Sequence, residues 1–301
     1  GDKVCLEGWY LNITNKSTNF VRDVEDGTIP DWVDWAGYAN SGTNTSDNRF
    51  FGYTTPYRVY WAIDHNYNNN WGDVQSGAEE TALKADFNIY QDGAGNPTMG
   101  SEGADVFNAD KPAYCLENTF ATTNMNQKET TAVVFKMTYD IDADGTAETF
   151  YIIGNSQEKK PTQTGTELVT AINNELKGTG TLTVALTTGE ITSGYYKTAQ
   201  KIKSLFTKEG GGTLSDDEAT QVLNAANGEI RVYKDGTTYY GIRIKHFGET
   251  YTALATQGVG SASDYDQEKH LGRYGVVRNN WYQINIASIS GPGRPTPPDP
   301  T

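Results

Sequence analysis

Short apolar runs that alternate with polar residues dominate this chain, and the alternation limits it to a fold built mainly of sheet. The clearest runs are 4–13, 57–63, 131–139, 229–233 and 281–288. In the last run, Tyr282, Ile284 and Ile286 share one face, as in a strand with one side buried. Thr outnumbers Leu about threefold, and Tyr also outnumbers Leu, a bias toward residues that suit a pleated surface. We therefore expect a mainly β fold.

Two Asp-Gly pairs predict tight hairpins. Asp144-Gly145 separates the run 131–139 from 149–153, and Asp235-Gly236 separates 229–233 from 238–244. An Asp-Gly pair between two alternating runs is a strong hairpin signal, because both residues tolerate positive φ. We expect each pair of runs to form one antiparallel hairpin.

The pattern changes to helical spacing over 155–228. Leu168, Ile172 and Leu176 lie on one helical face, and Ser215 with Glu218 fits a capping box before another apolar stripe. We therefore expect a small helical insertion at 155–228 in a sandwich formed by 1–154 and 229–291. Residues 292–301 are rich in proline and predict a semi-rigid extended tail.

The charge of the chain excludes several partners. Its net charge is −14, and no run rich in Lys and Arg offsets that charge locally. Such a surface repels the phosphates of nucleic acids and of anionic membranes. No run of about 18 apolar residues is present, so we expect a chain that does not span a membrane. Nucleic acid is not an expected partner.

Catalytic motifs are scarce. The only histidines, His65, His246 and His270, have no metal-ligand spacing, and neither a nucleophile elbow nor a phosphate-binding glycine loop occurs. A pair of carboxylates for glycoside hydrolysis stays open, because the defining distance is spatial. We expect no enzymatic activity, no catalytic residue and no cofactor.

One segment resembles half of a calcium loop. Asp140, Asp142 and Asp144 alternate before Gly145, as the first ligands of such a loop do. The twelfth position is Tyr151 instead of the bidentate Glu, and the flanking segments are strands. Two interpretations stay open: a weak calcium site, and a hairpin turn whose carboxylates are solvated.

The two cysteines, Cys5 and Cys115, allow at most one disulfide. A bridge across such a long loop would add about 4–5 kcal/mol in the chain-entropy model. Both residues lie in apolar contexts without an adjacent base, so a bridge or two buried thiols are favoured over a nucleophile.

Aromatic residues gather in the polar stretch 32–71. Trp32, Trp35, Tyr38 and Trp71 lie among many Asn residues. They are candidates for a sugar-stacking platform, since flat rings beside amide donors suit carbohydrate. They equally suit plugs that hold long loops onto a sandwich, and we favour the plugs.

The segment 271–291 resembles the C-terminal signature of Bacteroidales minor-fimbrium fimbrillins, the shaft subunits of type V pili. Its most specific part is Gly275 to Tyr282, followed by an alternating strand, a Gly-containing exit and the Pro-rich linker. The signature residues of this chain are Val276, Val277, Arg278, Asn279, Asn280, Trp281, Tyr282, Ile284 and Ile286. Weaker matches lie at 6–15, 113–119 and 239–240, whereas 155–228 has no counterpart.

This resemblance implies a transthyretin-like β-sandwich of Greek-key type, made as the C-terminal domain of a lipoprotein precursor. It implies neighbouring fimbrial subunits as partners and a cell-surface fimbrium at the outer membrane as the location. It also implies that a donor strand follows the linker residues Pro295, Pro297, Pro298 and Pro300. We expect the chain to be a fragment of such a subunit.

The leading hypothesis is therefore a structural subunit or adhesin of a bacterial surface fimbrium. It would polymerise by donor-strand exchange, in which a strand of one subunit completes the sandwich of the next. Its adhesion target would be a glycan or a protein of a host or bacterial surface. The alternative is a secreted or surface protein that binds or processes carbohydrate through the 32–71 aromatics.

Overall fold

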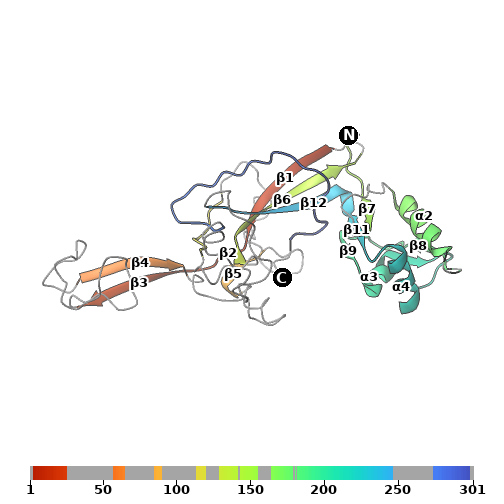
Figure 1. Ribbon diagram of the computed structural model, residues 1–301, viewed down its shortest axis with the longest axis horizontal. Coiled ribbons are helices and arrows are strands. Elements are labelled where there is room, and N and C mark those ends of the chain that lie inside the picture. Colours follow the sequence, from red (N-terminus) through yellow and green to blue (C-terminus); the bar gives the residue numbers. More distant parts are fainter. Residues whose placement is uncertain are drawn as a thin grey trace, which may run out of the picture.

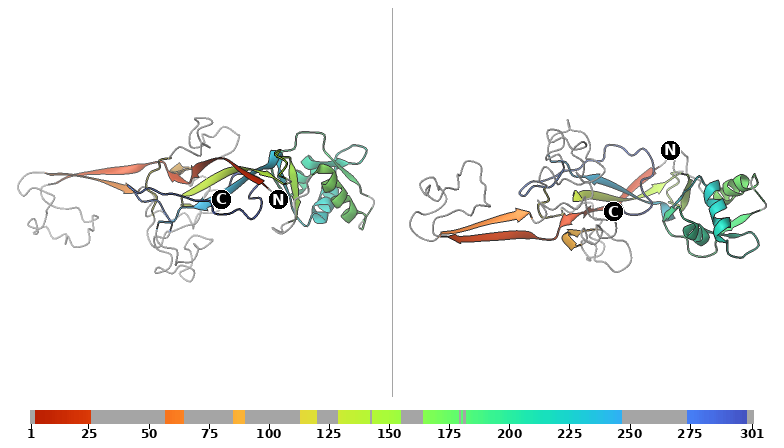
Figure 2. Two further views of the ribbon diagram at one scale, coloured as in Figure 1. Left: turned by 90° about the horizontal axis from the view of Figure 1, so that it is seen from above. Right: turned by 60° about the horizontal axis from the view of Figure 1, so that its bottom comes forward.

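The computed structural model describes residues 3–25, 57–64, 85–89, 113–119, 129–141, 143–154, 164–178, 180, 182–246 and 274–298. These residues are mainly β, with several antiparallel sheets and three short α-helices. The described elements form an elongated arrangement, with the β3–β4 ribbon at one end and the helices at the other (Figures 1 and 2). The predicted fold class is confirmed, and the paired sheets are consistent with a sandwich.

The central sheet has the strand order β1-β6-β12, and all neighbours are antiparallel. Its strands are β1 (Lys3–Asn12), β6 (Ala132–Asp140) and β12 (Thr237–Arg243). Opposed residues of antiparallel strands lie on one face, so Leu11, Val133 and Phe135 form the apolar core of one side. The runs at 4–13, 131–139 and 238–244 thus fold as the alternation predicts.

Both predicted hairpins are wrong, although their strands exist. The strand β7 (Phe150–Ile153) pairs with β11 (Ile230–Tyr233) and not with β6, while β12 pairs with β6 and not with β11. The segments that connect β6 to β7 and β11 to β12 run side by side from the central sheet into a second sheet, ordered β7-β11-β9. The Asp-Gly pairs therefore form two adjacent corners between sheets, not two reversals.

The corner at Asp235-Gly236 shows why the Asp-Gly pair is needed there. Asp235 has φ of 50° and Gly236 has φ of 66°. A Cβ on Gly236 would lie 2.5 Å from the carbonyl oxygen of Tyr139 at the end of β6. The backbone N–H of Asp235 donates to Thr149 Oγ1 at 3.0 Å, which joins the two corners.

The helices pack against the second sheet. They are α2 (Gly165–Leu176), α3 (Ala199–Leu205) and α4 (Asp216–Ala225), with the strands β8 (Val184–Leu186), β9 (Gly194–Tyr196) and β10 (Phe206–Lys208). The predicted capping box at Ser215 is present, and Thr164 forms another with Glu167. Leu168, Ile172 and Val222 share one core with Ile230 and Val232 of β11. The helices and the strands of the second sheet thus form one packed unit.

Smaller elements extend the other end of the central sheet. They are β2 (Thr14–Asn15), β5 (Phe87–Asn88), and a ribbon of β3 (Thr18–Glu25) and β4 (Tyr57–Asp64). Asp64, at the end of β4, accepts hydrogen bonds from Asn15 Nδ2 at 2.7 Å and from Thr119 N at 2.6 Å. Asp64 therefore anchors the base of the ribbon.

The expected last strand, 281–288, is not a strand. These residues form no ladder with any described strand, although Tyr282, Ile284 and Ile289 pack on the apolar core of the central sheet. An extended segment that buries one side shows alternating apolar residues whether or not its backbone pairs with a strand. The alternation therefore predicted the buried side correctly but not the pairing of the backbone. We call residues 281–290 the strap and residues 291–298 the tail (dark blue in Figure 1).

Candidate functional site

The strap only partly covers the apolar face of the central sheet. Leu6 pairs with Met137 and Ile242 pairs with Val133, so both lie on the face that carries the strap. Leu6 is 44% exposed and Ile242 is 42% exposed, and Ile286 of the strap is 40% exposed. The face therefore presents apolar side chains on both sheet and strap that another extended segment can cover.

Side-chain hydrogen bonds hold the start of the strap. The hydroxyl of Tyr282 lies 2.9 Å from the backbone N of Val277, which donates to it, and 2.6 Å from His246 Nδ1. Burial raises the pKa of Tyr282, the largest influence on that group, so its hydroxyl stays protonated at neutral pH. Tyr282 thereby fixes the strap where it leaves the preceding turn.

The signature residues before the strap form a tight turn against the segment 113–119. Val276 is 3% exposed and exchanges two backbone hydrogen bonds with Asn118, with N–O distances of 2.8 and 3.0 Å. Arg278 Nε donates to Glu117 Oε2 at 2.9 Å, and Asn279 adopts φ of 62°. Asn280 Nδ2 donates to the carbonyls that precede it, and Trp281 is 76% exposed. No sequence pattern pointed to the role of Glu117.

The tail runs along the outer edge of β12 instead of projecting from the fold. Tyr239 and Arg294 exchange both backbone hydrogen bonds, each with an N–O distance of 2.8 Å. A Cβ on Gly293 would collide with the carbonyl oxygen of Tyr239. Of the predicted linker residues, Pro295 is buried, Pro297 is partly buried and Pro298 packs against Gly241. Pro300 lies outside the described residues, and the linker role stays a prediction.

Two tyrosine hydroxyls, one from each of two sheets, donate hydrogen bonds to the backbone of the tail. Tyr240 Oη donates to the carbonyl of Gly291 at 2.7 Å, and Tyr233 Oη donates to that of Gly293 at 2.8 Å. The guanidinium of Arg294 lies 5.9 Å from the ring centroid of Tyr195, within the range of a cation–π contact. The tail thus joins the central sheet to the second sheet.

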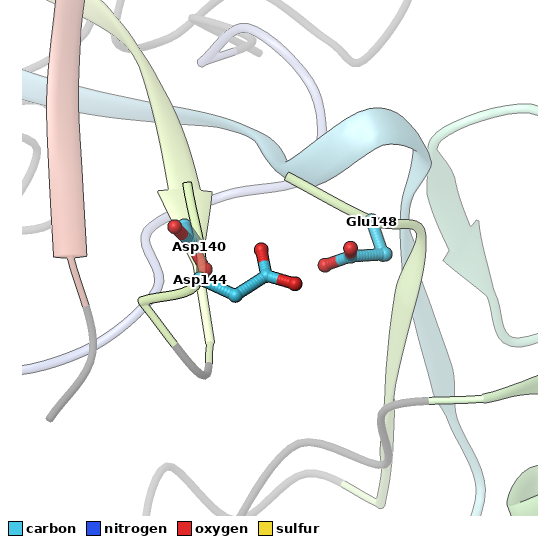
Figure 3. Close-up of side chains that lie close together, drawn as sticks. All are labelled: Asp140, Asp144 and Glu148. Atoms are coloured by element: carbon cyan, nitrogen blue, oxygen red, sulfur yellow. The ribbon is translucent and has the colours of Figure 1, made fainter. Parts of the chain in front are cut away.

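Three carboxylates converge beside the first corner (Figure 3). One oxygen of each of Asp140, Asp144 and Glu148 lies within 4.8 Å of the others, with Asp140 buried and the other two exposed. Asp140 accepts hydrogen bonds from the backbone N–H of Ala143 at 2.8 Å and of Gly145 at 3.0 Å. These bonds are those of a turn-forming aspartate. Asp142 lies outside the described residues, and the choice between a weak calcium site and a turn with solvated carboxylates stays open.

The remaining predicted residues are separate from this region or outside the described part. Cys5 and Cys115 both have free, exposed thiols, so the disulfide that the sequence left open is not formed in this structure. The aromatic residues Trp32, Trp35, Tyr38 and Trp71 lie outside the described residues. Within the described part, no helix has the length and the apolar character that crossing a membrane needs.

Comparison with known proteins gives one informative match. Residues 231–301 match the family model of the C-terminal region of fimbrillin, the major fimbrial subunit protein type IV. The match begins within β11 and takes in β12, the strap and the tail. No curated protein matches the chain. The match supports a fimbrillin domain at this end of the chain, and the matched family is one of structural subunits.

Proposed function

We propose that the chain is a structural subunit or adhesin of a bacterial surface fimbrium of the type V pilus kind. The similarity of residues 231–301 to fimbrillin supports a fimbrial structural role, a cell-surface location and association with other fimbrial subunits. The finer parts of the proposal are an origin in the Bacteroidales, a lipoprotein precursor, an outer-membrane fimbrium, a transthyretin-like topology and polymerisation by donor-strand exchange. Adhesion to a surface glycan or protein belongs to the same proposal.

The single observation that carries strand exchange is the incomplete cover of the central sheet. The strap lies over the apolar face without a ladder to any described strand, and Leu6, Ile242 and Ile286 stay partly exposed around it. A donated strand that enters there buries its alternate side chains against this apolar surface, and its backbone can pair with that of the strap, which forms no ladder with any described strand.

The tail argues against entry of the donor strand at the β12 edge of the central sheet. On the β12 edge, Arg294 already pairs with Tyr239, and the adjacent Pro295 has no N–H to donate. Proline and a docked segment block further strand addition at an edge. In this proposal the donor strand therefore enters on the strap side and not along β12.

A non-enzymatic role completes the proposal. Among the described residues, His246 lies within hydrogen-bonding distance of Tyr282 and so supports the strap. Asp140 accepts bonds from the backbone of its own turn. Both groups thus have structural roles, in keeping with the structural family that the chain matches.

The decisive experiment extends the chain past Thr301 by its natural downstream segment and follows assembly on gels in sodium dodecyl sulfate. Donor-strand polymers resist this detergent, so we expect a ladder from the extended chain. The matched control carries the same extension with its alternate apolar residues replaced by Ser, and should give no ladder. If the extended chain gives no ladder, alone or with sister subunits, strand exchange is wrong.

A pair of neighbouring substitutions tests where the donor strand binds. Leu6 lies on the strap side of β1, and Cys5, also exposed, lies on the opposite side of the same strand. Leu6→Asp should abolish the ladder because it puts a charge where the donor side chains must be buried. Cys5→Asp should leave the ladder intact. Equal effects of the two substitutions would contradict the proposed acceptor face.

A further inference from the structure

Two large aromatic side chains are almost fully exposed next to the turn at 277–280. Tyr114, in the segment 113–119, is 87% exposed, and Trp281, in the segment 274–281, is 76% exposed; Leu116, two residues after Tyr114, is 38% exposed. Each ring lies three residues from the Glu117–Arg278 ion pair that joins the two segments. We call Tyr114, Leu116, Arg278 and Trp281 the aromatic patch. Trp and Tyr are enriched at interfaces, and groups of exposed apolar side chains often mark interaction surfaces.

The backbone under the aromatic patch is fixed. Asn118 and Val276 exchange two backbone hydrogen bonds, and Asn118 Nδ2 donates to the carbonyl of Glu129 at 2.8 Å. The ion pair and the bond from Val277 N to Tyr282 Oη hold the other side. A partner that binds here therefore orders few additional groups, which lowers the entropic cost of association.

Sequence stretches without charged residues contribute to and adjoin the aromatic patch, although the molecule as a whole is strongly acidic. Residues 279–293 contain no Asp, Glu, Lys or Arg, and neither do residues 113–116. Glu117 and Arg278 form an ion pair, so their charges offset each other. The whole chain carries a net charge of −14, so two copies repel each other over most other orientations. Contact between copies through this patch therefore costs less electrostatic energy than contact through acidic surface.

We propose that the aromatic patch is a contact surface between two copies of this chain. Its composition of Trp, Tyr, Leu and Arg is that of the residues that contribute most at protein interfaces, whereas Lys, Glu and Asp are depleted there. Rings on both copies bury apolar area, and the amides of Asn279, Asn280 and Gln283 supply a polar rim. This contact does not use the apolar face of the central sheet around Leu6, and it does not depend on a donated strand.

Sedimentation velocity of the 301-residue chain over a range of concentrations tests this contact. We expect reversible association that strengthens between about 0.05 M and about 1 M salt, because screening removes the repulsion between two acidic molecules. Sodium dodecyl sulfate should dissociate these dimers, whereas polymers formed by strand exchange should resist it. Failure of the ladder experiment would thus leave this result unaffected, and the reverse also holds.

Two variants locate the contact. Trp281→Ala should lower the association constant about tenfold or more, as for a central interface tryptophan. The matched control is Cys5→Ala, which also truncates an exposed side chain but lies outside the aromatic patch and on the side of β1 away from Leu6, and it should associate like the parent. Because both side chains are largely exposed, each variant should keep the melting temperature of the parent to within a few degrees. Equal association of the two variants would overturn the proposal.

The two free cysteines give a second readout. Cys115 adjoins Tyr114, and Cys5 lies on β1, outside the aromatic patch. Association should slow maleimide labelling of Cys115 and leave labelling of Cys5 unchanged. A chain that stays monomeric at every concentration and salt tested would overturn the proposal. Saturable quenching of tryptophan fluorescence by a neutral oligosaccharide, lost in Trp281→Ala, would assign the patch to a sugar and overturn it as well.

Discussion

The central sheet and the second sheet are built from the same two continuous segments of the chain, yet they differ in how their apolar sides are covered. The pair β6–β12 continues across the two corners as the pair β7–β11. In the second sheet, Ile230 and Val232 are 0% exposed, because three helices pack there. In the central sheet, Ile242 is 42% exposed on the side that carries the strap.

The difference teaches that burial depends on what covers a strand as much as on the strand itself. β11 and β12 are adjacent in sequence and similar in alternation, and only their neighbours differ. A helix pair supplies apolar side chains over a whole face, whereas one extended segment contacts only a narrow line of residues. The helical unit therefore closes the apolar side of the second sheet more completely than the strap closes that of the central sheet.

Truncating an isoleucine on each sheet should give the largest contrast. Ile230→Ala removes a fully buried side chain and should cost about 2–5 kcal/mol of unfolding free energy. Ile242→Ala removes a half-exposed one and should cost less than about 1 kcal/mol. Urea unfolding of the two variants measures the difference. Similar losses would mean that the two sheets are equally closed.

Alkaline pH should weaken the junction between the two sheets. Burial, the largest cause, raises the pKa of Tyr233 well above its ordinary value, and its ring stacks on Phe150 at 4.4 Å between centroids. Because the folded-state pKa is the higher one, the stabilisation is complete below pH about 10. It is then lost as pH rises, since the unfolded state releases the proton first.

Thermal melting between pH 8 and pH about 12 measures that loss. Tyr233→Phe should flatten the decline in melting temperature, whereas the partly exposed Tyr195→Phe should retain it. A decline of the same slope in Tyr233→Phe would show that other groups cause it.

Loosening the strap should have a smaller effect on stability. Tyr282→Phe removes the hydroxyl that accepts the Val277 N–H and should cost about 1 kcal/mol. The clearer readout is amide hydrogen exchange, in which residues 283–290 should exchange faster than in the parent while β11 keeps its protection. Tyr274→Phe, on the other side of the turn, serves as the control. Unchanged exchange in the strap would contradict the role given to Tyr282.

The smallest expected effect concerns calcium. If Asp140, Asp144 and Glu148 only shape and surround a turn, millimolar calcium should not change the melting temperature. We expect that result, because Asp140 already accepts two backbone N–H groups. A rise that disappears in Asp144→Asn, measured by thermal melting with and without a chelator, would instead establish the ion site.

The sequence predicted the local elements well because their causes are local. The strands β1, β4, β6, β7, β11 and β12 follow from alternation, and the helices follow from apolar spacing and from caps such as Ser215 with Glu218. The short strands β9 and β10 were not predicted, since three residues carry too little pattern. The resemblance at 271–291 also pointed to the region that the fimbrillin match covers.

The partners of these elements were not predictable in the same way. Asp144-Gly145 and Asp235-Gly236 fix a bend in one chain but do not say which strand lies beside it, so the hairpins were wrong. Similarly, the alternation of Tyr282 and Ile284 reports one buried side, whether or not the backbone is paired. The pairing of Arg294 with Tyr239 had no signal at all.

The sequence by itself therefore determined which segments are extended, which are helical, and that the molecule carries a strong net negative charge. Tertiary structure alone decided that the two Asp-Gly pairs are corners, that the strap lacks a ladder, and that the tail lies on β12. The physical reason is range: dihedral preferences and side-chain periodicity act within a few residues. Strand pairing and face coverage depend on segments as far apart as Leu11 and Ile284, which meet only in the folded chain.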